Sequence, residues 1–131
     1  MIRTILILPL LLIGIQLLAQ NPQAQKLKWT CTKAKDLSSQ TEINKGYTFI
    51  TDTDKIEWTQ SPDKVYLFTV TDYEGVWEDI SQAGSITYSI SSGSREGTLQ
   101  FLKNELGLKI VMTLPNSTKY SFDVQSVSPT N

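Results

Sequence analysis

Apolar and polar residues alternate along most of the chain from Leu27 onward. The alternation falls in seven short runs: Leu27–Cys31, Tyr47–Phe49, Ile56–Trp58, Ile86–Ile90, Leu99–Phe101, Leu108–Met112 and Tyr120–Val124. A period of two turns one face of a strand inward and the other outward. β-branched and aromatic residues, which strands favour, dominate these runs. The pattern therefore predicts β-strands around one apolar core containing Trp29, Trp58, Phe101, Ile110 and Phe122.

The run Val65–Val70 departs from this alternation, because it is apolar on nearly every position. Such a strand is typical of positions covered on both faces. We expect the N-terminal segment or a short helix to cover it, since exposed apolar strands invite aggregation. The alternative is that this strand meets a ligand or a partner.

Short clusters of Asp, Asn, Ser, Gly and Pro separate the runs and indicate hairpin turns, with Gly107 suited to a positive φ. Two longer gaps remain. The segment Lys33–Asn44 is polar and is compatible with a short helix or a loose strand. The segment Tyr73–Ala83 is compatible with an additional strand. No helical period of ten or more residues appears, so the chain is predicted to be all-β, with about eight antiparallel strands.

A single small antiparallel meander of about eight strands closes either as a barrel or as a β-sandwich. We favour the barrel, because closure removes the sheet edges. This arrangement resembles secreted lipocalin-like, or calycin-like, barrels in architecture. The Gly-x-Trp signature expected near the first strand of that group is absent, since Leu27 and Lys28 precede Trp29.

The first nineteen residues have the order of a secretory signal peptide. Arg3 precedes an apolar run from Ile5 to Leu18, and Ala19 ends it before polar residues begin. We expect cleavage after Ala19, with Ala24 as an alternative site and a retained anchor as the competing interpretation. Residues 20–131 then form a single β domain that is secreted or periplasmic, without stable membrane insertion.

The charge of the mature chain argues against a nucleic-acid partner. Twelve Lys and Arg residues stand against thirteen Asp and Glu, and Arg3 is the only one of these in the first nineteen residues. Residues 20–131 therefore carry a net charge of −2, whereas nucleic-acid binding needs a strong local basic excess. Cys31 is the single cysteine, which excludes an internal disulfide, and we expect it to be buried.

The chain contains no histidine, which removes the commonest general base and transition-metal ligand. We expect no catalytic residues, no metal and no cofactor. One cluster of acidic residues stands out, and it consists of Asp72, Glu74, Glu78 and Asp79. Such a cluster is compatible with a weak calcium site or with a carboxylate pair that acts on a sugar. The absence of calcium-loop spacing favours a solvated loop instead.

These observations favour a non-enzymatic binding protein. The first hypothesis is a carrier of a small apolar ligand inside a lipocalin-like barrel, acting as a monomer. The alternative is a protein-interaction module, or an inhibitor of a secreted enzyme, that uses a sheet face. An uncharacterised carboxylate hydrolase is the third. The predicted contact residues for a ligand or partner are Tyr66, Phe68, Tyr73 and Trp77.

Overall fold

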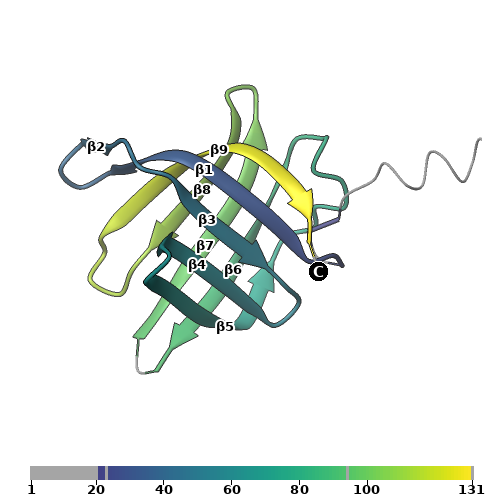
Figure 1. The fold of residues 1–131 in the computed structure, drawn as a ribbon. Helices are drawn as coiled ribbons and strands as arrows, with labels where there is room; N and C mark the ends of the chain where they lie inside the picture. Colours follow the sequence, from purple (N-terminus) through teal and green to yellow (C-terminus); the bar gives the residue numbers. More distant parts are fainter. Residues whose placement is uncertain (1–20, 23, 94, 131) are drawn as a thin grey trace, which may run out of the picture.

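The computed structural model describes residues 21–22, 24–93 and 95–130, which form nine β-strands in one antiparallel sheet (Figure 1). The strands are β1 (Leu27–Asp36), β2 (Thr41–Ile43), β3 (Tyr47–Thr51), β4 (Lys55–Ser61), β5 (Lys64–Glu74), β6 (Gly84–Ser92), β7 (Arg95–Asn104), β8 (Gly107–Thr113) and β9 (Lys119–Pro129). Among these residues no helix is long and apolar enough to cross a membrane. The predicted signal peptide, residues 1–19, lies outside the described residues.

The sheet closes on itself. From β3 to β9 each strand pairs with the next, β1 pairs with β3, and β9 returns to pair with β1 along its whole length. The result is a closed eight-stranded barrel of β1 and β3–β9, with β2 added at one end of β1 (Figure 1). The all-β prediction and the preference for a barrel are confirmed.

Strand β1 continues past the alternating run that predicts it. Its last residues, Ala34 to Asp36, pair with Ile43 to Thr41 of β2, after a turn at residues 37–40. The gap Lys33–Asn44 is therefore the end of one strand, a turn and a short strand, rather than a helix. Register shifts around Cys31 bend β1 against β9, which helps the barrel curve.

The inward faces of the strands fill the barrel with aromatic and branched side chains. Trp29, Phe101, Ile110 and Phe122 are at most 1 % exposed, and the Trp29 and Phe101 rings lie 4.7 Å apart. Trp58 packs against this core but remains partly exposed. Four of the five predicted core residues are thus buried, whereas Trp58 lies at the margin of the core.

Two expectations about the less regular segments are wrong. The chain from Tyr73 to Ala83 holds no additional strand, because β5 ends at Glu74 and residues 75–83 form a loop. Among the described residues, nothing covers the outer face of Val65–Val70: Val65 is 49 % exposed and Leu67 is 60 % exposed. In a closed barrel only the inward face of a strand meets the core, so the outward positions of this run stay in solvent.

Candidate functional site

One end of the barrel is closed by chain segments that pack into it. Pro22 is fully buried there, and the Tyr88 hydroxyl donates a hydrogen bond of 3.3 Å to its carbonyl oxygen. From the loop after β5, Trp77 inserts into the same end, where it is 2 % exposed and its ring lies 6.1 Å from that of Trp29. Ile80 of this loop is also buried.

The loop that carries Trp77 is fixed by its own polar contacts. The Asp79 carboxylate accepts hydrogen bonds from the backbone amide and the hydroxyl of Ser81, at 2.9 and 2.8 Å. These bonds hold the pKa of Asp79 below its ordinary value. Gly84 at the start of β6 lies so close to the Trp77 ring that a Cβ atom there would overlap it. A side chain at this position would therefore require the Trp77 ring or the strand to shift.

The opposite end of the barrel is open and contains a recess of about 510 Å³, which we call the mouth recess. The β4–β5 hairpin, the end of β6, the start of β7 and the β8–β9 turn surround it. Its apolar and aromatic lining consists of Trp58, Tyr66, Phe68, Ile90, Leu114 and Pro115, with Gly97. Its polar lining consists of Gln60, Ser92, Arg95, Glu96 and Asn116.

Trp58 forms the boundary between the mouth recess and the core. Its ring stacks on Phe49 with a centroid distance of 5.8 Å and an interplanar angle of 3°, and Phe49 is fully buried. On the recess side Tyr66 lies 5.4 Å from the same ring. The register Trp58↔Tyr66 places these two side chains opposite each other on neighbouring strands. The aromatic surface therefore continues from the packed core to the opening.

The three tryptophans differ in how their indole N–H groups are satisfied. Trp29 Nε1 donates to the Thr51 hydroxyl at 2.9 Å, and Trp77 Nε1 donates to the Gln82 carbonyl at 3.0 Å. Trp58 Nε1 is buried and has no hydrogen-bond partner in the described part of the chain. A buried donor without a partner costs about 1–3 kcal/mol. A side chain beside a recess thus retains an unused hydrogen-bond donor.

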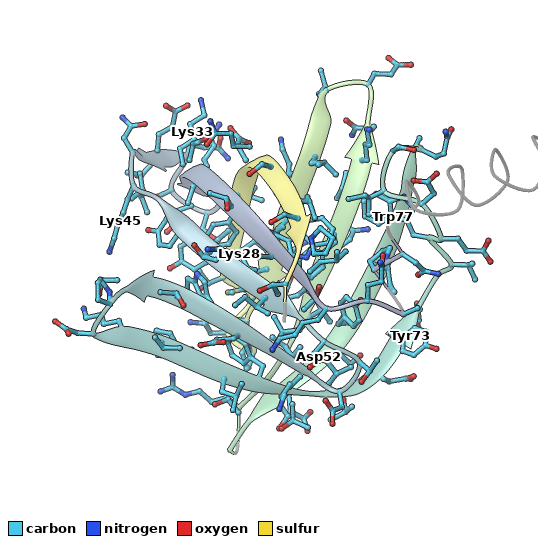
Figure 2. All side chains as sticks on the ribbon, turned by 45° about the vertical axis from the view of Figure 1, so that its right-hand side comes forward. Lys28, Lys33, Lys45, Asp52, Tyr73 and Trp77 are labelled. Carbon is cyan, nitrogen blue, oxygen red and sulfur yellow. The ribbon has the colours of Figure 1, made fainter. Side chains whose placement is uncertain are left out.

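The structure separates the four predicted contact residues into two pairs. Tyr66 and Phe68 line the mouth recess. Tyr73 and Trp77 lie at the closed end, on the same side of the molecule as Asp52, whereas Lys45 lies at the other end (Figure 2). Tyr73 is 52 % exposed. Trp77 is buried and, with Pro22 and Ile80, forms what we call the plug of the closed end. The four residues therefore do not form one site.

The recess also contains residues outside the four predicted contact residues. Trp58 and Ile90 belong to alternating runs that predict core, and Arg95 directly follows the Ser, Gly cluster at residues 91–94 that predicts a turn. What these three residues share is their position around the mouth recess, on strands β4, β6 and β7. That shared position appears only once the strand order and register are known.

The acidic residues near Trp77 do not converge on a ligand. Asp79 bonds within its own loop, and Asp72 accepts a hydrogen bond from the amide of Tyr73 at 2.8 Å. Within residues 21–22, 24–93 and 95–130, no group of three or more His, Cys, Asp or Glu side chains is arranged to hold a metal ion. The geometry gives no reason to assign metal chemistry to this loop.

Comparison with known proteins adds no family to this picture. No family model matches the chain, and neither a curated protein nor a solved structure is significantly similar to it.

Proposed function

We propose that this protein is an exported, non-enzymatic carrier that holds a small apolar molecule in the mouth recess. The recess itself carries this proposal. Its volume of about 510 Å³ lies within the range of about 300–1,000 Å³ typical of small-molecule pockets. An apolar and aromatic lining with a few polar groups at the margin is also typical of such pockets.

The polar groups of the recess suit a ligand with one polar end. Arg95 follows the β6–β7 turn at the margin, where a guanidinium group can pair with a carboxylate while staying solvated. The rings of Trp58, Tyr66 and Phe68 supply the apolar wall. An amphipathic molecule with a short alkyl or aromatic body and an anionic or hydrogen-bond-accepting group fits this division.

Sequence features support the remaining parts of the proposal. The charge–apolar–polar order of the first residues supports export to a secreted or periplasmic location. The absence of histidine from the sequence supports a role without acid–base catalysis. We propose that the mature chain acts as a monomer, without a cofactor or nucleic acid.

The test is calorimetric titration of the mature protein with dodecanoate and, separately, with dodecanol. We expect both to bind, and Tyr66→Ser to weaken both by about tenfold, because the ring that packs beside Trp58 is lost. Arg95→Gln should weaken dodecanoate only, because dodecanol carries no charge to pair.

Tyr73→Ser is the matched control. Tyr73 lies on the same strand as Tyr66 and has a similar exposed fraction, 52 % against 44 %, but it lies at the closed end. If Tyr73→Ser and Tyr66→Ser weaken binding equally, the ligand does not occupy the mouth recess. The absence of binding by either probe to the unmodified protein would contradict the choice of ligand class.

A further inference from the structure

Two positions near the start of the chain have the small residue that an export cut follows, Ala19 and Ala24. A signal-peptide cut also prefers a small residue two positions before that alanine. This residue is Leu17 for the first cut and Pro22 for the second, and neither is small. The criterion therefore does not separate the two cuts. They differ in the fate of residues 20–24, so the role of these residues in the folded protein becomes the deciding observation.

A hydrogen-bonded turn joins Asn21 to Gln25, directly before β1. The carbonyl oxygen of Asn21 accepts hydrogen bonds from the backbone amides of Ala24 and Gln25, at 3.1 and 2.9 Å. The backbone amide of Asn21 donates to Oε1 of the Gln25 side chain at 2.6 Å. All three bonds use a backbone group of Asn21. A cut after Ala24 would therefore remove the whole turn.

Pro22 is the residue of this turn that enters the barrel. It is fully buried, and its carbonyl oxygen accepts the hydrogen bond from the Tyr88 hydroxyl at 3.3 Å. Tyr88 itself is only 3 % exposed. Loss of residues 20–24 would empty the space that Pro22 fills and would take away the acceptor of a buried hydroxyl. Both changes destabilise a folded protein.

We propose that residues 20–24 stay on the mature chain as the N-terminal part of the plug, so that the export cut falls before Asn21 and not after Ala24. A chain that begins at Gln20 keeps the turn, the buried Pro22 and the Tyr88 bond. This inference rests on the proposed export of the protein. It does not rest on ligand binding, because the mouth recess lies at the opposite end of the barrel.

The first experiment expresses the full chain in an export-competent host and measures the intact mass of the exported protein. We expect the mass of residues 20–131. Ala19→Leu should prevent this cut, because a bulky residue replaces the small one, whereas Ala24→Leu is the matched control and should be cut at the same place. A product of residues 25–131 would overturn the inference and leave export intact. A product that retains Met1 would contradict both.

A second experiment compares the purified polypeptides 20–131 and 25–131 by thermal melting. We expect the shorter one to melt at least about 4 °C lower, because the burial of Pro22 and the Tyr88 bond are lost. Tyr88→Phe should lower the melting temperature of the longer polypeptide and have little effect on the shorter one, which lacks the acceptor. Tyr66→Phe, at the open end, is the control and should act equally on both. Equal melting temperatures of the two polypeptides, or equal effects of Tyr88→Phe, would overturn the proposed role.

A single substitution covers the case in which the shorter polypeptide does not fold. Pro22→Ala removes the buried ring and keeps the backbone carbonyl that Tyr88 bonds. We expect it to lower the melting temperature of residues 20–131, and Tyr88→Phe to retain its full effect in this background. Ala24→Ser is the matched control, because Ala24 is exposed in the same turn. Equal melting temperatures of Pro22→Ala and Ala24→Ser would mean that the N-terminal segment is not part of the plug.

Discussion

The two ends of this barrel use the same kinds of side chain in opposite ways. At the closed end Trp77 reaches inward from the loop at residues 75–83, is 2 % exposed and has its indole N–H bonded. At the open end Trp58 belongs to a strand that turns at residues 62–63, is partly exposed and has no partner for its N–H among the described residues. The long β5–β6 connection supplies Trp77 to cover the core at the closed end, whereas the tight β4–β5 turn leaves the mouth recess beside Trp58 at the open end.

This difference teaches where the molecule gains stability and where it has room to bind. Filling an end with an aromatic plug buries apolar surface and satisfies polar groups, which stabilises the fold. The open end forgoes part of that gain at Trp58 and retains a recess of about 510 Å³. We therefore expect substitutions at the closed end to lower stability and those at the open end to change binding.

We expect the largest loss in the free energy of unfolding when the Trp77 ring is removed from the closed end. Trp77→Ala removes a buried aromatic ring that contacts Trp29, and truncation of such a ring costs about 3–5 kcal/mol. Denaturant unfolding followed by circular dichroism measures the change. Trp58→Ala should cost less, because part of that ring is already in solvent, and equal losses would remove the distinction between the two ends.

The fit of the plug against β6 gives the next prediction. Gly84→Ala places a methyl group against the Trp77 ring, so we expect a loss of about 1–3 kcal/mol from overpacking. Gly46→Ala is the control, since the nearest atom to a Cβ there is the carbonyl oxygen of Cys31 at 3.7 Å. Thermal melts of the two variants should therefore differ, and similar melting temperatures would mean that the loop moves aside at no cost.

A matched pair of indole substitutions sharpens the comparison further. Trp29→Phe and Trp58→Phe remove the same atoms, but only the first leaves the buried Thr51 hydroxyl without its donor. We expect Trp29→Phe to be more destabilising than Trp58→Phe by about 1–3 kcal/mol, measured by chemical unfolding. If Trp58→Phe is the more costly, its N–H has a stabilising partner after all.

The smallest expected effect concerns alkaline pH. Burial raises the pKa of Tyr88 from 10.0 to about 12, with a smaller contribution from Tyr73. The unfolded state loses this proton at lower pH than the folded state. The contribution of Tyr88 to the free energy of unfolding is therefore fully present below pH 10 and falls as pH rises toward 12. Burial, followed by the charge of Asp123, likewise raises the pKa of Cys31 from 9.0 to about 12, so part of the decline begins near pH 9.

Tyr88→Phe should make the decline shallower, at a cost near neutral pH of about 1 kcal/mol for the lost hydrogen bond to Pro22. Tyr66→Phe is the control, because its side chain is 44 % exposed at the open end. Melting temperatures between pH 8 and 11 measure the difference. An unchanged slope in Tyr88→Phe would assign the decline to other groups.

The alternation of apolar residues predicted seven of the nine strands and their inward faces, whereas β2 and β5 lie outside the alternating runs. The barrel followed from the preference for a sheet without edges. The alternation was not sufficient to separate Trp29 from Trp58, because a period of two gives the face of a strand and not the height of a residue along the barrel axis. The acidic surroundings of Trp77 suggest an exposed loop, yet this side chain is buried. Its contact with Trp29, across the barrel end, depends on tertiary structure that no local pattern contains.

Strand β5 is a second case in which the local sequence pattern does not determine the tertiary structure. The sequence shows that both of its faces carry apolar residues. We expected other segments to cover both faces because most strands of this kind are buried on both sides. The strand also extends beyond the end of β6, and this extension depends on the lengths of two hairpins and on the register shift between Val70 and Asp72. Registers of this kind are set by the closed sheet as a whole.

The pairing of β1 with β9 has a consequence for the order in which the molecule is made. Leu27 pairs with Pro129 and Asp36 with Tyr120, so the first strand of the barrel has no partner on one side until the last strand has been synthesised. Contacts between such distant segments form slowly, because a long loop must be ordered before they contribute. A ribosome-bound chain that lacks residues 119–129 therefore has an open sheet with two edges. Folding to the closed state is in effect a step that follows synthesis.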